Sequence, residues 1–202
     1  MLRTQLTLAA FAVAVPSVVF GQAFMYTSQE RSIYAQAGSD SASLSASDFL
    51  TFDQRVSRAL GNTGAGSEQS SSLLEGSISL FGDLGTTVWG VTTNRARGVF
   101  DVSFTLTQAT DIRFFYVVNA VWNFTIWTPS GSQVIATSTD LGGIYDDRVS
   151  HFAAGTYRLR ADADVTNGQS GNITVEMTII PAPASLTLAA GAGLVSCRRR
   201  RR

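Results

Sequence analysis

Apolar and polar residues alternate in short runs through the second half of the chain, a pattern typical of strands that bury one face. In segment 122–127 the side chains of Trp122, Phe124 and Ile126 fall on one face. Turn signals at Pro129–Gly131 and Asn167–Gly168 separate such runs. The expected strands are 99–107, 112–118, 122–127, 133–137, 155–161 and 172–179. Short strands without a long helical pattern predict an all-β fold, a single β-sandwich or jelly-roll-like domain.

The first half of the chain carries a weaker pattern. Small and polar residues alternate over 32–47, which suits strands with a thin inner face, and Phe49 and Phe52 are expected to clip onto the sandwich. Glycine and serine dominate residues 62–72, and this composition predicts a flexible loop. Two further strands are expected at 77–81 and 86–89. Because no linker divides residues 24–180, we expect one domain there.

The chain begins with the layout of a secretory signal peptide. Arg3 gives a positive start, an apolar stretch runs over 6–20, and Gly21 and Ala23 supply small residues at a cleavage site. These are the three regions of a signal peptide, which would be a helix over residues 1–23. The alternative is a buried N-terminal helix of the folded protein.

The other end is an apolar run of 12 residues, 186–197, followed by an arginine cluster. Such a run is shorter than the roughly 17–25 residues that span a bilayer. Each arginine costs about 2.5–3.5 kcal/mol at mid-membrane, so an exported chain should stall there with its arginines in the cytoplasm. The alternative, a nucleic-acid patch, lacks basic or aromatic support elsewhere.

The C-terminal segment 181–202 resembles the PEP-CTERM sorting signal of exported bacterial proteins. The matching residues are Pro181, Ala182 and Pro183, the hydrophobic helix at 186–197, and the cluster Arg198, Arg199, Arg200, Arg201 and Arg202. Ala182 stands where the family motif has Glu. The resemblance implies transient anchoring in the inner membrane, processing by exosortase, and release to the cell surface or extracellular matrix, where exopolysaccharide is a possible partner.

The second half also resembles the sandwich domains appended to secreted bacterial peptidases, the pre-peptidase C-terminal domains. The features are a Phe-x-Leu strand at 104–106, a Pro-x-Gly hairpin at 129–131 and the stretch Ala154–Leu159. These motifs describe how a sandwich turns its corners, so they imply a fold and no activity.

Charge and cysteine content narrow the function of the body, residues 24–180. All 15 basic residues are arginine; nine lie in the body with all 15 acids, which gives it a formal charge of −6. An acidic body argues against a nucleic-acid partner, for which phosphate contacts dominate affinity. Cys197 is the single cysteine. The body therefore has no disulfide framework, and its fold must be held by packing.

The residues that could carry chemistry are few, and the sequence predicts no enzyme, no metal and no cofactor. His151 is the single histidine, expected in a loop or at a strand edge. Two carboxylate pairs, Asp146/Asp147 and Asp162/Asp164, are expected on the surface. Their alternatives are Ca²⁺ ligands or a glycosidase acid and base.

Exposed aromatic residues would indicate a sugar-binding platform. The candidates are Trp89, Trp122, Trp127, Tyr116 and Tyr145. Most of them are expected in the core, with Trp127 at the mouth of its hairpin as the exception. The first hypothesis is therefore a non-catalytic, exported cell-surface or matrix protein. The alternative is a carbohydrate-binding module of the extracellular polysaccharide.

Overall fold

A computed structural model describes residues 24–87, 93–131, 133–136 and 143–180, and all of its regular elements are strands. The strands are β1 (Phe24–Ala37), β2 (Asp40–Ser45), β3 (Phe52–Leu60), β4 (Thr63–Leu74), β5 (Ser77–Thr87), β6 (Asn94–Leu106), β7 (Thr110–Val118), β8 (Trp122–Trp127), β9 (Gln133–Ala136), β10 (Ile144–Phe152), β11 (Gly155–Thr166) and β12 (Ser170–Ile180). The prediction of an all-β fold is confirmed. Within this part of the chain no helix is long and apolar enough to cross a bilayer.

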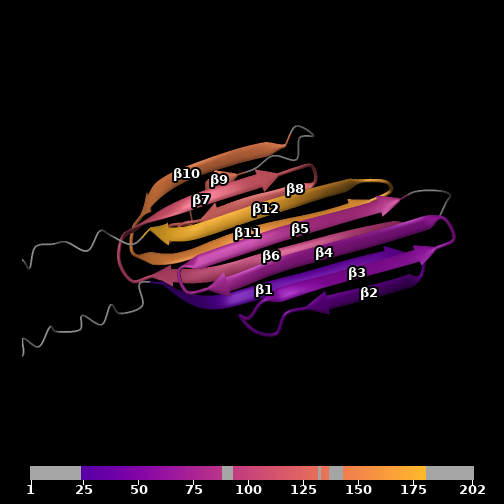
Figure 1. Ribbon diagram of the computed structural model, residues 1–202, viewed down its shortest axis with the longest axis horizontal. Coiled ribbons are helices and arrows are strands. Elements are labelled where there is room, and N and C mark those ends of the chain that lie inside the picture. Colours follow the sequence, from indigo (N-terminus) through magenta and orange to yellow (C-terminus); the bar gives the residue numbers. More distant parts are fainter. Residues whose placement is uncertain (1–23, 88–92, 132, 137–142, 181–202) are drawn as a thin grey trace, which may run out of the picture.

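Two antiparallel six-stranded sheets pack face to face (Figure 1). Sheet A has the order β2-β1-β6-β11-β8-β9, and sheet B the order β10-β7-β12-β5-β4-β3. From β5 to β8, and again from β9 to β12, each strand is followed by one in the other sheet. The turn predicted at Asn167–Gly168 is one of these crossings: both residues have positive φ, 54° and 84°, and they join β11 of sheet A to β12 of sheet B.

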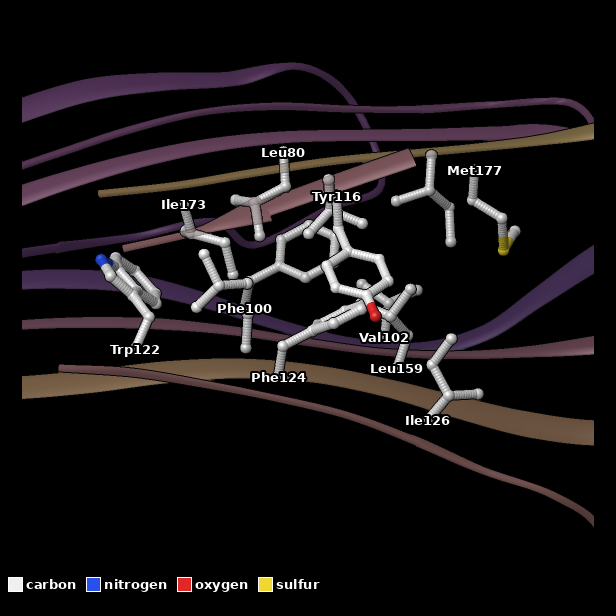
Figure 2. Packing of buried hydrophobic residues seen from close by; sticks show 14 of the residues in the cluster. Leu80, Phe100, Val102, Tyr116, Trp122, Phe124, Ile126, Leu159, Ile173 and Met177 are labelled. Atoms are coloured by element: carbon white, nitrogen blue, oxygen red, sulfur yellow. The ribbon is translucent and has the colours of Figure 1, made fainter. Parts of the chain in front are cut away.

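Alternation along most of the strands builds the core between the sheets. Phe104 on β6, Phe124 on β8 and Val175 on β12 are each completely buried, as their sequence positions predict. The side chains interdigitate in the space between the two layers (Figure 2). Of the inward positions expected on the last strand, Ile179 is the exception, being half-buried near the strand end.

Two glycines face each other across the core to make room for Trp122. A Cβ on Gly82 of β5 would lie 2.7 Å from the indole ring, and so would a Cβ on Gly98 of β6. The buried indole N–H donates to the carbonyl of Gly171 at 3.2 Å. The largest side chain of the core is therefore seated between backbone surfaces that carry no side chain.

The prediction of a flexible loop at residues 62–72 is wrong. These residues form most of β4, which pairs with β3 on one side and β5 on the other. Every second residue from Thr63 to Leu73 is buried. Four of these six buried residues are small (Thr63, Ala65, Ser67 and Ser71), so a composition that is typical of loops here belongs to a strand with a thin inner layer.

The prediction of two separate strands at 77–81 and 86–89 is also corrected by the structure. The structure has one continuous strand, β5, over Ser77–Thr87, because Gly82 and Gly85 continue the extended backbone. The clip predicted at residues 49 and 52 is partly confirmed. Phe52 is buried, whereas Phe49 stays 39% exposed and stacks on Tyr26 with ring centroids 5.8 Å apart.

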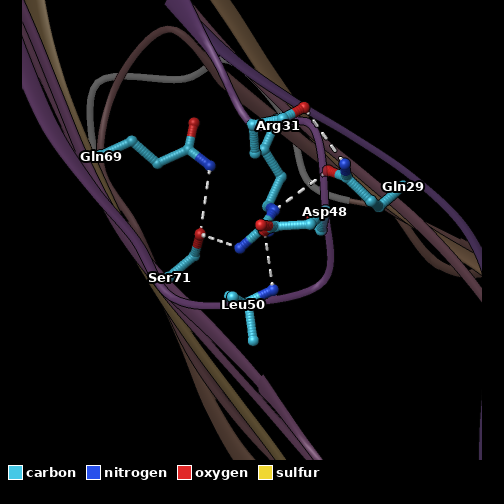
Figure 3. A network of polar contacts seen from close by, with 7 residues as sticks. Gln29, Arg31, Asp48, Leu50, Gln69 and Ser71 are labelled. Atoms are coloured by element: carbon cyan, nitrogen blue, oxygen red, sulfur yellow. Dashed lines mark hydrogen bonds and ion pairs between the residues drawn. The ribbon is translucent and has the colours of Figure 1, made fainter.

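A polar network centred on Arg31 lies between the sheets at the middle of β1 (Figure 3). Arg31 is completely buried, and burial lowers the pKa of its guanidinium, which stays a cation. It donates to the Asp48 carbonyl at 2.6 Å, to Gln29 Oε1 at 3.1 Å and to Ser71 Oγ at 3.4 Å. These bonds tie β1 of sheet A to β4 of sheet B and to the connection between β2 and β3.

Candidate functional site

The residues of the sorting signal lie outside the described part of the chain. This applies to Pro181, Ala182, Pro183 and the five arginines 198–202, and also to the signal-peptide residues 1–23 and to Trp89. The site that the structure builds is therefore in the sandwich.

The two carboxylate pairs lie on different sheets, and each of the four carboxylates forms an ion pair with an arginine. Asp146 and Asp147 lie on β10 of sheet B, and Asp162 and Asp164 lie on β11 of sheet A. The ion-pair partners are Arg148 for Asp146, Arg113 for Asp147, Arg160 for Asp162 and Arg95 for Asp164. Among the described residues, no group of three or more His, Cys, Asp or Glu side chains is arranged to hold a metal ion.

His151 lies on β10, the edge strand of sheet B, as the sequence predicts for a strand edge. Its Nδ1 is 2.8 Å from Asp111 Oδ1, and both side chains are exposed. The neighbouring Ser150 follows the alternation of the strand and turns toward the opposite face.

The aromatic candidates divide between core and surface. Trp122 and Tyr116 are buried, as expected of core residues. Trp127 lies half-buried on the outer face of sheet A, where the Arg158 guanidinium stacks over its ring at 5.3 Å. Tyr145 is 66% exposed on the outer face of sheet B. Two of the candidates therefore reach the surface, on opposite sides of the molecule.

The outer face of sheet B carries a hollow of about 290 Å³ beside Tyr145. We call it the sheet B hollow. It is lined by Arg113, Phe115, Asp147, Glu176 and Thr178. Strand register brings these residues together, because Phe115 of β7 is paired with Asp147 of β10 on one side and with Glu176 of β12 on the other. Its volume is near the lower limit of roughly 300–1,000 Å³ for ligand sites.

Phe115 forms the aromatic wall of the hollow, and Tyr145 packs against this wall from outside the lining. The rings of Phe115 and Tyr145 meet edge to face, with centroids 5.6 Å apart and planes at 79°. Phe115 is half-buried and so fixed by its neighbours, while the Tyr145 ring projects into solvent. Aromatic pairs of this geometry are favourable by about 0.5–1.5 kcal/mol beyond their buried area. The wall is thus an exposed but held apolar surface.

The charged groups of the hollow are fixed by a two-point ion pair. Arg113 Nε donates to Asp147 Oδ1 at 2.9 Å and Nη2 to Oδ2 at 2.7 Å. These hydrogen bonds lower the pKa of Asp147 and raise that of Arg113. Glu176 adds a second carboxylate on the other side of Phe115, so the hollow has a formal charge of −1. Its acceptors and its guanidinium donor suit hydroxyl groups better than anionic groups.

The sequence analysis singled out Asp147 and Tyr145 but missed Arg113, Phe115, Glu176 and Thr178. Each occupies a solvent-facing position of a predicted strand, and that alternation was the available signal. Their meeting depends on the pairing of β7 with β10 and β12, strands that are distant in sequence, which the local pattern does not encode.

The chain was compared with known proteins by sequence and by structure. No protein-family model matches the chain, and no curated protein matches it. Among solved structures, the chain is similar to a GH31 α-xylosidase from Xanthomonas citri, with 8% sequence identity and a TM-score of 0.25. The match covers 76% of this chain and 26% of the xylosidase, so the chain spans about a quarter of that enzyme's length.

This match corrects one expectation. The sequence predicts that the protein is not an enzyme, whereas the similar structure is a glycoside hydrolase, and we withdraw the prediction. A TM-score this low carries no argument for a fold or an activity, so no reaction is assigned in its place.

Proposed function

We propose that this chain is an exported bacterial cell-surface or extracellular-matrix protein. Residues 1–23 act as a signal helix, and the hydrophobic helix at 186–197 halts the chain in the inner membrane until exosortase processes it. The order of three features supports this proposal: the Pro181–Pro183 step, the apolar run and the five arginines. This order is the one that stops an exported chain with its cationic end in the cytoplasm.

The sorting step can be tested by mass spectrometry of the mature C-terminus. In a host with its exosortase, we expect the secreted protein to have lost residues 198–202. In the same host without the enzyme, we expect those arginines to remain and the protein to stay with the membrane. Arginines retained on secreted protein in both hosts would contradict the proposal.

A second function is favoured by a specific observation, the exposed Tyr145 held against Phe115. We propose that the sheet B hollow binds a sugar unit of the exopolysaccharide, with the ring face on Phe115 and on Tyr145 at the edge of the hollow. The hydroxyls of the sugar bind Asp147, Glu176 and Arg113. Concave sites that combine an aromatic surface with a few placed polar groups are typical of small-molecule recognition. The formal charge of −1 favours neutral sugars over uronic acids.

Binding to the purified exopolysaccharide, measured by affinity electrophoresis of the full chain, tests this proposal. Tyr145→Ala should weaken binding by about tenfold or more, equivalent to about 1.4 kcal/mol. The matched control is Tyr34→Ala, which removes a half-exposed tyrosine from the outer face of sheet A. Equal losses in both variants, or no loss in Tyr145→Ala, would argue against the hollow.

We further propose that β5–β12 form one jelly roll that β1–β4 extend. The strand orders β10-β7-β12-β5 and β6-β11-β8-β9 support this, because consecutive strands, except β8 and β9, lie in opposite sheets. Two sets of four strands arranged in this way are typical of double Greek-key sandwiches. In this proposal β3 and β4 widen sheet B beyond β5, and β1 and β2 widen sheet A beyond β6. Residues 24–180 are then a single domain between the two sorting segments.

A further inference from the structure

Exposed apolar side chains gather at one end of the sandwich. β1 begins and β12 ends at this end, on the left in Figure 1. Ten large hydrophobic side chains are exposed in the described part of the chain, and five of them lie here. They are Met25, Phe49, Leu50, Leu74 and Ile180, and we call this surface the terminal end.

Hydrogen bonds and a ring contact hold the elements of the terminal end together. The Tyr26 hydroxyl donates to the carbonyls of Leu74 at 2.9 Å and Ser77 at 2.6 Å, and its ring stacks on Phe49. Burial raises the pKa of this hydroxyl, so it remains a donor. The Ile179 amide donates to the Gly76 carbonyl at 2.9 Å, beside Leu74. The apolar side chains thus belong to adjoining, mutually bonded segments.

The sequence beyond β12 connects the terminal end to the apolar run. Ile180 is the last residue of β12, and only residues 181–185 precede Leu186. Five residues span at most about 18 Å when fully extended. If the run 186–197 enters a bilayer, as the proposed function requires, the terminal end lies within reach of the lipid headgroups.

We propose that the terminal end docks on the bilayer surface while the C-terminal segment is in the membrane. Its partner is lipid, and it inserts Leu50, Leu74 and their apolar neighbours among the headgroups. Contiguous exposed apolar side chains are typical of such interaction sites. The inference rests on the membrane stop of the proposed function and adds an orientation: the opposite end of the sandwich, with the β3–β4 turn, points away from the lipid.

The charge of the body gives no attraction to anionic lipid, so the proposed docking depends on apolar insertion. The body has a formal charge of −6, and Asp48, Glu75 and Asp111 lie at the terminal end itself. Attraction of basic residues to anionic headgroups is screened by salt, whereas apolar insertion is not. Docking should therefore persist at high salt and on vesicles without anionic lipid.

Single-cysteine labelling of the full chain in phosphatidylcholine vesicles tests the orientation. The native Cys197 reports on the tail. In a Cys197→Ser background, Leu50→Cys reports on the terminal end and Asn62→Cys on the opposite end; both positions are exposed, so the fold should tolerate the change. With an environment-sensitive fluorophore and a lipid-borne quencher, we expect quenching at 197 and 50, in low and high salt, and none at 62.

Each outcome decides between the two proposals. A quenched tail with an unquenched label at 50 overturns the docking inference and leaves the membrane stop intact. An unquenched tail overturns the membrane stop and, with it, the docking. Equal quenching at 50 and 62 indicates unspecific adsorption and also overturns the proposed orientation.

Discussion

At the scale of single residues, arginine is the polar partner on which this protein relies. With no lysine in the chain, every side-chain ion pair of the sandwich other than that of His151 uses a guanidinium. On the outer face of sheet A, Asp101 is only 7% exposed and receives Arg158 Nε at 2.8 Å. The planar fork of arginine matches a carboxylate at two points. This geometry fixes surface carboxylates such as Asp147. In the core, Arg31 instead distributes its donors over Gln29, the Asp48 carbonyl and Ser71.

Arg31→Met should be strongly destabilising. The substitution keeps much of the volume but leaves the acceptors of Gln29, Asp48 and Ser71 without their buried donor. We expect a loss of about 3 kcal/mol in the free energy of unfolding, measured by urea denaturation. The control is Arg55→Met on β3, where the side chain is 75% exposed and 3.9 Å from Glu68; its effect should stay within about 0.5 kcal/mol. Similar effects for both would mean that the buried network contributes nothing of its own.

The pKa of Asp147 should lie below the ordinary aspartate value, which is about 3.9. Arg113 stabilises the charged carboxylate, so the folded-state pKa is below the unfolded one. The contribution of this pair to stability is therefore present above the unfolded pKa and is lost as pH falls through the folded one. Carboxyl-carbon NMR titration should show the midpoint of Asp147 rising in Arg113→Gln, while that of Asp164, paired with Arg95 on the other sheet, stays in place.

At the scale of elements, the size of the side chains on the inner faces sets how closely the two sheets approach. β4 buries mainly small residues, and the end of β1 buries Ala35 and Ala37. The hydroxyl of Ser67 on β4 donates across the interface to the Arg97 carbonyl of β6 at 3.0 Å. Around Trp122, the space for the indole ring is left by two glycines, Gly82 and Gly98. Small residues, which a sequence pattern assigns to loops, here decide how near the two layers lie.

Gly98→Ala should therefore destabilise the sandwich. Its Cβ would lie 2.7 Å from the Trp122 ring and 3.3 Å from a Leu84 methyl, and both side chains are buried in the core. Overpacking of this kind costs about 1–3 kcal/mol. The matched control is Gly66→Ala on β4, whose Cβ would lie 3.8 Å from the Val56 carbonyl oxygen. Calorimetry should show a fall in Tm for the first variant and little change for the second; an unchanged Tm in Gly98→Ala would mean that Trp122 moves freely.

At the scale of the whole molecule, the fold is held by contacts between strands far apart in sequence. β6 pairs with β1 and β11, and β12 pairs with β5 and β7, so no short segment holds a complete sheet. The described body has no cysteine, and packing must hold it. The two outer faces of the sandwich differ. Sheet A carries a set of ion pairs between arginine and aspartate, and sheet B carries the hollow with its aromatic wall.

Residues 77–180, the eight strands β5–β12 alone, should not unfold cooperatively. Removing residues 24–76 takes away the partner of β5 in sheet B and the partner of β6 in sheet A, and it uncovers both edges. Exposed edges of this length favour aggregation. Thermal unfolding followed by circular dichroism should show a cooperative transition for 24–180 and none for 77–180. A shared Tm would instead make β1–β4 an appendage to an independent jelly roll.

The sequence by itself determined the strand class and the faces of the strong strands, since a period of two places Phe104, Phe124 and Val175 on one side whatever their partners. It also carried the layout of the terminal segments, which depends on order and charge alone. Only the tertiary structure decided that β4 is a strand, because its glycines and serines gain their extended conformation from β3 and β5. Tertiary structure also built the sheet B hollow, since Phe115, Asp147 and Glu176 meet through pairing between distant strands, which local alternation does not specify.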